Sequence, residues 1–158
     1  MSMNCPCGGP SKFSINTTLR KKPIKGNNIK SVSFNECCAK YLDMGNRATD
    51  AEALMRSRYS AYVLGRVNYL NATWHKRTKP DQLSLENEVK WLGLEVKCFT
   101  QSQSNLAEVE FVARYKIDGK AYRLHERSRF QQEKLENSDP ALKADEMAWF
   151  YVDGDIFY

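Results

Sequence analysis

The sequence predicts an α+β fold, in which helices from the first half pack on one face of an antiparallel sheet formed by the second half. Three observations lead to this prediction. Residues 49–65 carry the start signal, apolar spacing and stop signal of one long helix. From Trp91 onward the apolar residues recur at every second position, which is typical of strands. Asp118-Gly119 lies between two such runs and indicates a tight hairpin.

The expected long helix has clear end signals and one anomalous face. Thr49 and Glu52 have the spacing of a capping box, and Gly65 can end the helix in the left-handed conformation. Arg58 falls in the middle of the apolar face, and Arg56 lies at its border. On a helical wheel, the apolar members of this face are Ala51, Leu54, Met55, Tyr59, Tyr62 and Val63.

A second, short helix is expected at residues 67–72, followed by Trp74 and His75. Trp74 is expected in the core, with an indole N–H that needs a partner. A histidine beside an aromatic residue is most often a hydrogen-bonded structural group, and the alternative is a role in a pocket. The segment around Ser84 has the composition of one further short helix.

Three stretches alternate as strands, at residues 91–98, 109–115 and 122–130, and the apolar run at 147–152 predicts a fourth strand. In the first of them, Cys98 is expected to be a small core residue. Asp153-Gly154 predicts a turn into a short terminal strand at residues 155–158. The polar segment 133–146 is expected to be a loop.

Glu126 is the unusual member of its strand face, because it is a carboxylate in line with apolar and hydroxyl residues. It is the natural counterion for Arg58 or Arg56, since a buried cation is costly without an anion. Two alternatives stay open. Arg58 can extend its head to water over a buried stem, and Glu126 can lie hydrated near a sheet edge.

Length and composition are those of a soluble protein with one main domain, and the length leaves room for a small appendage. No apolar run approaches the roughly 20 residues that span a bilayer, and the N-terminus has no hydrophobic secretion core. We therefore expect a cytoplasmic protein without a membrane span. These features leave the partner and the ligand open.

The net charge of +5 is concentrated near the N-terminus, where residues 1–35 contain six basic residues and no acidic residue. Such a segment is usually a solvated loop, but it can also meet nucleic acid, anionic lipid or an acidic protein surface. Nucleic acid is the least favoured of these partners, because Phe13 is the only aromatic residue in 10–33 that could stack on bases.

Two cysteine pairs flank this basic segment, and in a reducing compartment such pairs point to a metal ion before a disulfide. Four thiolates satisfy tetrahedral zinc, and a thiolate tetrahedron also accepts iron. The spacings Cys-x-Cys and Cys-Cys are less usual than Cys-x-x-Cys, so unrelated free thiols are the alternative. The four residues are Cys5, Cys7, Cys37 and Cys38.

These residues, together with the helix, resemble known families. The segments 5–8 and 34–38 resemble the SEC-C metal knuckle at the C-terminus of the preprotein translocase motor. The run 51–63, with 73–75 and 126–130, is similar to the bacterial YchJ-like family. The resemblance covers nearly the whole chain, and the family knuckle usually has a short loop where this chain has the basic insertion 10–33.

The resemblance implies a nuclear-transport-factor-2-like cone, in which a curved antiparallel sheet wraps a long helix. It also implies zinc on the four cysteines, with residues 1–40 as the knuckle and 41–158 as the cone. It transfers no reaction. By analogy with the translocase tail, it favours an adaptor whose knuckle meets a protein partner such as a chaperone.

The alternative function is a small-molecule or enzymatic pocket inside the cone. Arg58 would bind an anionic ligand there, and His75 or Glu126 could move a proton. A closed ion pair between Arg58 and Glu126 would speak for a structural role, whereas an open cavity between them would favour the pocket. The expected pocket residues are Arg56, Arg58, Tyr59, Trp74, His75 and Glu126.

Overall fold

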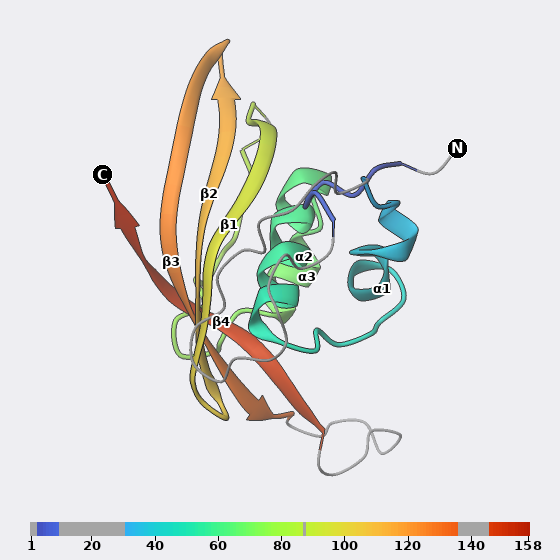
Figure 1. Cartoon of the computed structure of the whole chain (residues 1–158), viewed down its shortest axis with the longest axis vertical. Helices are drawn as coiled ribbons and strands as arrows, with labels where there is room; N and C mark the ends of the chain where they lie inside the picture. Colours follow the sequence, from blue (N-terminus) through green and yellow to red (C-terminus); the bar gives the residue numbers. More distant parts are fainter. Residues whose placement is uncertain (1–2, 10–30, 87, 136–145) are drawn as a thin grey trace.

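The computed structural model describes residues 3–9, 31–86, 88–135 and 146–158. A four-stranded antiparallel sheet curves along one side of the molecule, with helices α2 and α3 against one face (Figure 1). The N-terminal segment and helix α1 lie on the other side of α2, away from the sheet (Figure 1). The expected cone-like α+β arrangement is therefore confirmed.

The helices occupy the first half of the chain, as predicted. Helix α2 spans Ala51–Leu64 and α3 spans Val67–Ala72, while a 3-10 turn, η1, at Phe34–Glu36 leads to the short helix α1 at Ala39–Leu42. Gly65 ends α2 with φ of 71°, in the left-handed conformation that glycine adopts without strain.

The predicted capping box is wrong. Asp50, and not Thr49, caps α2, because its carboxylate accepts a hydrogen bond from the Ala53 backbone N–H at 2.8 Å. Glu52 is turned instead toward Arg56, four residues on. A cap carboxylate also meets the positive end of the helix dipole, so Asp50 contributes through charge as well as through its hydrogen bond.

Helix α2 is buried on nearly all sides, and not only along its apolar face. The sheet covers one side and the N-terminal segment covers another, so polar positions are enclosed as well. The buried polar residues of α2 are Glu52, Arg56, Ser57, Arg58 and Ser60. A helix in this position must satisfy its polar side chains internally, which makes their partners informative.

The strands run in chain order across the sheet, β1-β2-β3-β4. They span Lys90–Gln103, Leu106–Ile117, Lys120–Lys134 and Met147–Phe157. The predicted hairpin at Asp118-Gly119 joins β2 to β3, with φ of 50° and 76° at the two turn residues. Two consecutive positive φ values are those of the turn that fits the right-handed twist of a strand pair.

Strand β1 departs from simple alternation because its pairing with β2 shifts at three points, including one between Val96 and Cys98. The shift directs Phe99 into the core, where it is 2% exposed, and leaves Cys98 half-buried. The prediction that Cys98 is a core residue is therefore wrong. A bulge changes which face each later residue occupies, and the side-chain pattern alone does not reveal it.

Strand β4 is continuous through Asp153-Gly154, so the predicted turn there is wrong. Gly154 pairs with Ser128 of β3 inside the ladder. The segment around Ser84 also lacks the predicted helix, since residues 82–86 have no regular secondary structure. Residues 10–30 of the basic insertion and most of the predicted loop at 133–146 lie outside the described residues.

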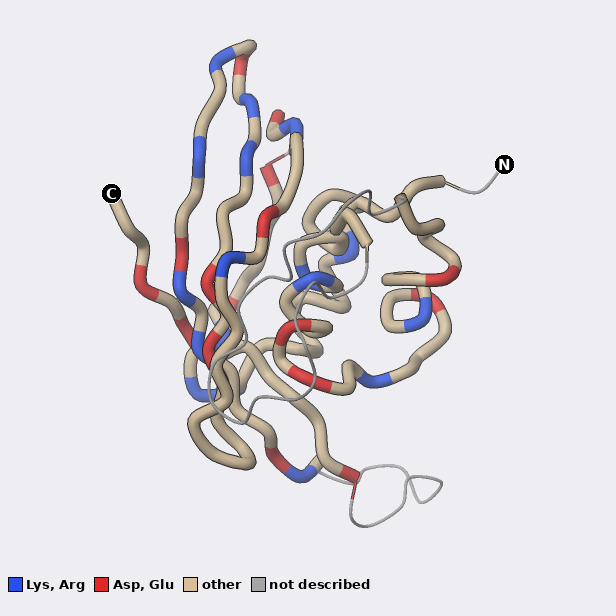
Figure 2. Tube along the Cα trace, in the orientation of Figure 1, with Lys and Arg blue, Asp and Glu red and all other residues tan. Residues whose placement is uncertain are grey.

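The face of the sheet away from the helices carries charged side chains of both signs. Basic and acidic residues both occur along the strands (Figure 2). His125 Nε2 lies 2.8 Å from Glu110 Oε1, and Arg127 Nη2 lies 3.3 Å from Glu110 Oε2. Arg129 forms a further ion pair with Asp155 at 2.7 Å. In the described part of the chain, no helix is long and apolar enough to cross a membrane.

Candidate functional site

The two cysteine pairs meet because backbone hydrogen bonds join the segments that carry them. The Cys5 N–H donates to the Val32 carbonyl at 2.8 Å, and the Phe34 N–H donates to the Met3 carbonyl at 2.7 Å. Beyond Cys7 the chain turns through Gly8, whose φ is 85°. Short backbone pairing therefore places residues 5 and 7 beside residues 37 and 38 despite the long insertion between them.

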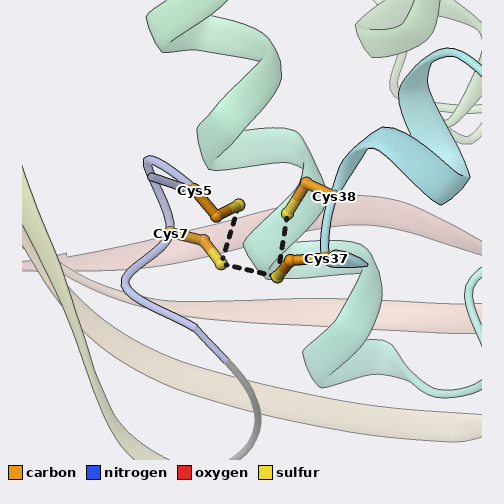
Figure 3. Close-up of side chains that lie close together, drawn as sticks. All are labelled: Cys5, Cys7, Cys37 and Cys38. Carbon is orange, nitrogen blue, oxygen red and sulfur yellow. Dashed lines mark hydrogen bonds between the residues drawn. The ribbon is translucent and has the colours of Figure 1, made fainter. Parts of the chain in front are cut away.

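The four cysteine sulfurs point toward one another (Figure 3). All four lie within 4.8 Å of each other. The Sγ atoms of Cys5 and Cys7 are 3.5 Å apart, as are those of Cys7 and Cys37, and those of Cys37 and Cys38 are 4.0 Å apart. Cys37 is half-buried, and the other three are buried.

This geometry fits one tetrahedral metal ion. Sulfurs at 2.3 Å from a central zinc ion lie about 3.8 Å apart, which agrees with the observed spacing. Without a cation the cluster opposes full ionisation: the neighbouring Cys37 sulfur raises the pKa of the Cys38 thiol. A divalent ion would remove that conflict, because thiolates are the form that binds metal.

Helix α2 is attached directly to the cysteine cluster. Arg56 Nη1 donates to the Cys7 carbonyl at 3.1 Å, and Arg56 Nε forms a buried ion pair with Glu52 at 2.9 Å. The Cys5 sulfur lies 3.7 Å from Ser60 Oγ. Arg56, expected in the cone, therefore lies on the cluster side of the helix and takes its counterion from its own helix.

The opposite side of α2 faces a cavity of about 260 Å³ between the helix and the sheet. Its walls are mostly aromatic. Arg58, Tyr59, Trp74 and Glu126, four of the six expected pocket residues, line it. The remaining lining residues are Met55, Tyr62, Trp91, Phe111, Ala113, Leu124, Ser128, Phe130 and Tyr151.

Arg58 is 5% exposed and is held by neutral acceptors. Its Nη1 donates to the Leu70 carbonyl at 2.9 Å and to Thr73 Oγ1 at 2.7 Å. The guanidinium carbon also lies over the rings of Trp74 and Tyr151, 5.0 and 4.7 Å from their centroids. Burial lowers the pKa of Arg58, which shows the cost of enclosing this cation.

The predicted ion pair between Arg58 and Glu126 is wrong. Among the described residues, no carboxylate lies within ion-pair distance of Arg58, whose polar partners come from the end of α3. Glu126 Oε1 instead accepts hydrogen bonds from Ser128 Oγ at 2.8 Å and Tyr151 OH at 3.1 Å. The two charges line the same cavity from α2 and from β3 without meeting.

His75 lies outside this cavity. Its Nε2 is 2.7 Å from Glu133 Oε1, and its Nδ1 accepts a hydrogen bond from the Arg77 backbone N–H at 3.1 Å. The His75 N–H also donates to the Tyr151 carbonyl, which fixes the segment after α3 to β4. These contacts are those of a buried, hydrogen-bonded histidine. Trp74 Nε1 is buried and has no hydrogen-bond partner in the part of the chain that the structure describes.

The sequence reasoning missed Tyr62, Trp91 and Tyr151 as cavity residues. Tyr62 was available from the helical wheel, where it lies one turn after Arg58. Tyr151 pairs with Phe130 across the β3–β4 ladder, whereas Glu126 pairs with Ile156, and the side-chain pattern carries no signal of this register.

Comparison with known proteins gives a family and a set of relatives. The family model for the middle, NTF2-like domain of YchJ matches residues 50–154. The UPF0225 protein of Polaromonas naphthalenivorans (strain CJ2) is 46% identical over 157 residues, covering 99% of this chain and 100% of that protein. A UPF0225 protein of Cupriavidus pinatubonensis is 46% identical over 123 residues, covering 78% of this chain and 82% of that one.

Two solved structures share the fold. The crystal structure of a SEC-C motif containing protein from Psychrobacter arcticus is 27% identical, with a TM-score of 0.69, covering 98% of this chain and 83% of that one. The solution structure of a SEC-C motif containing protein from Rhodopseudomonas palustris is 24% identical, with a TM-score of 0.67, and the match covers 99% and 100% of the two chains. At that identity the second likeness concerns the fold alone.

Proposed function

The chain belongs to the YchJ-like family, and from that premise we propose that it is a binding protein built around one structural metal ion. Cys5, Cys7, Cys37 and Cys38 would hold the ion, which we propose to be zinc. The observation that carries this proposal is the convergence of four cysteine sulfurs within 4.8 Å of one another. The solved relative from Psychrobacter arcticus, described as containing a SEC-C motif, supports it.

An ion held by four thiolates has no open coordination position for water or substrate, so such a centre stabilises structure and does not catalyse hydrolysis. Its effect here would be to tie residues 5–7 to residues 37–38 and both to α2. We propose that residues 1–40 form the knuckle and residues 41–158 form the cone. Five free cysteines without a disulfide suit the cytoplasm, where we place the protein.

We further propose that the outer surface of the knuckle docks a protein partner. Met3 is 48% exposed there, and Asn35, Glu36 and Lys40 are exposed beside the cysteine cluster. The analogy with the SEC-C tail of the preprotein translocase motor suggests a chaperone or a translocation-related protein. This adaptor role is supported by analogy and by the exposed methionine.

Metal analysis of the full chain, purified without chelators, tests the centre. We expect about one zinc ion per chain, lost in Cys37→Ser and kept in the control Cys98→Ser, since Cys98 lies on the sheet. One iron ion per chain would contradict zinc while keeping the centre. A metal-free protein whose melting temperature is unchanged by EDTA would contradict both.

For the adaptor role, Met3→Ser combined with Lys40→Glu should abolish capture of any protein that the wild type retains reproducibly. The control is Lys97→Glu on the exposed part of the sheet. Equal capture by both variants would contradict docking at the knuckle.

One observation favours a second candidate function, ligand binding inside the cone. Arg58 and Glu126 face a common cavity of about 260 Å³ instead of closing on each other. A charge pair with only a structural role has no need of the space between its members, and concave, mostly apolar pockets with few polar groups are typical of ligand sites.

A further inference from the structure

We infer that the cavity between α2 and the sheet binds a small molecule that carries a carboxylate on a flat apolar body. The inference rests on the second candidate function, ligand binding inside the cone, and is independent of the metal at the cysteines. It depends on three features: a buried cation without an anionic partner, an opposing carboxylate that is already hydrogen-bonded, and aromatic walls.

The cation is Arg58, which is 5% exposed. The hydrogen bonds from Arg58 to Leu70 and Thr73 both leave from Nη1 and go to neutral oxygens, and the Tyr62 hydroxyl beside the guanidinium is neutral as well, since burial raises its pKa. A buried charge that is met only by neutral groups and ring faces remains costly. The planar guanidinium matches a carboxylate with two parallel hydrogen bonds, which makes a carboxylate its best complement.

Glu126 does not fill that role, because its charge is already met by hydroxyl groups. Its Oε1 accepts from Ser128 and Tyr151, and burial raises the pKa of Tyr151, so that hydroxyl keeps its proton as a donor. Glu126 Oε2 has no hydrogen-bond partner among the described residues and can accept from a donor on a ligand. A ligand carboxylate is therefore expected on the α2 side of the cavity, away from Glu126.

The cavity walls and volume define the rest of the ligand. Tyr62, Trp91, Phe111 and Phe130 present aromatic surface around the charged groups. A dry apolar cavity of about 150 Å³ is enough for benzene. The volume of about 260 Å³ therefore admits one aromatic ring and a short acid chain, but not a nucleotide or a long lipid.

The test compares 3-phenylpropanoate with its uncharged amide, 3-phenylpropanamide, by NMR titration and calorimetry on the full wild-type chain. We expect the acid to bind at least tenfold more tightly than the amide, with the largest shift changes at Trp74, Trp91 and Tyr151. In Arg58→Met the tenfold preference should disappear, whereas the control Arg66→Met, at an exposed arginine after α2, should keep it.

The outcomes separate the two claims. Equal binding of acid and amide would overturn the carboxylate preference and leave ligand binding inside the cone in place. No binding of either compound at millimolar concentration would overturn both this inference and the second candidate function. The wild-type comparison needs no variant, so the test stands if Arg58→Met fails to fold.

Discussion

Gly154 of β4 lies directly against the carboxylate of Glu126 on the neighbouring strand. A Cβ added to Gly154 would come within 2.9 Å of Glu126 Cγ and closer still to its Oε1, a separation that real Cβ atoms do not show. Glycine is therefore required here for close approach, because Glu126 reaches across the backbone of β4 on its way to Tyr151.

We predict that Gly154→Ala displaces Glu126 and destabilises the fold by about 1–3 kcal/mol, the usual cost of overpacking. Equilibrium urea unfolding measures this change. The matched test is a double-mutant cycle with Glu126→Ala, which removes the clashing atoms. The alanine at 154 should then cost much less, and additive effects of the two substitutions would contradict the close-approach account.

The same residue shows why part of the fold could not be read from the sequence. Asp-Gly predicts a turn at 118–119 and at 153–154 with equal force, and only the first is a turn. Glycine accommodates either a positive φ or a crowded neighbour, and the crowding at Gly154 depends on a side chain 28 positions away. Local pattern predicted α2, α3 and the four main strands, because these elements depend on periodicity or on a continuous apolar run, but it did not predict α1.

The candidate site, like the fold, could be predicted from the sequence only in part. The cysteine cluster could be proposed from residue type, and Arg58 and Glu126 could be recognised because each interrupts an apolar face. The partner of Arg58 could not be predicted, because it is the Leu70 carbonyl, a backbone group that no side-chain pattern reveals. Cys98 was assigned to the core because the register shift in β1 also leaves no mark in the side-chain pattern. Backbone acceptors and register shifts are properties of the folded chain.

The start of α2 gives a second prediction, because Asp50 and not Thr49 caps the helix. Asp50→Ala should lower the free energy of unfolding by about 0.5–2 kcal/mol, since it removes the bond to the Ala53 N–H and a negative charge at the helix start. Thr49→Ala is the matched control and should change it by less than about 0.5 kcal/mol. A larger loss for Thr49→Ala would restore the capping box.

A third prediction concerns pH and the outer face of the sheet. The hydrogen bond from His125, with further help from Arg127, holds the pKa of Glu110 below its ordinary value of 4.5. A lowered carboxyl pKa means that the unfolded chain binds the proton more readily, so the stabilisation is present above pH 4.5 and is lost as pH falls through the lowered pKa.

Glu110→Gln should accordingly reduce stability at pH 7, by less than about 1 kcal/mol because the group is partly exposed. The difference between variant and wild type should shrink below pH 4.5. Thermal melts from pH 3 to pH 7 measure it, with Glu88→Gln, at an exposed position before β1, as the control. A difference that grows in acid would be inconsistent with the lowered pKa.

The last prediction tests whether α2 and the cysteine cluster form one unit. Arg56 joins them through its hydrogen bond to the Cys7 carbonyl and its buried ion pair with Glu52. Arg56→Met removes both, and breaking a buried pair from one side costs about 3–5 kcal/mol. If the metal is held as proposed, the variant should also release zinc to a chelator faster, because the Cys7 carbonyl loses its hydrogen bond to Arg56.

Arg47→Met is the matched control, since the Arg47–Glu146 pair is about one-third exposed and far less costly to remove. Urea unfolding together with the rate of zinc release measures both effects. Equal behaviour of the two variants would show that the cluster is held independently of the helix.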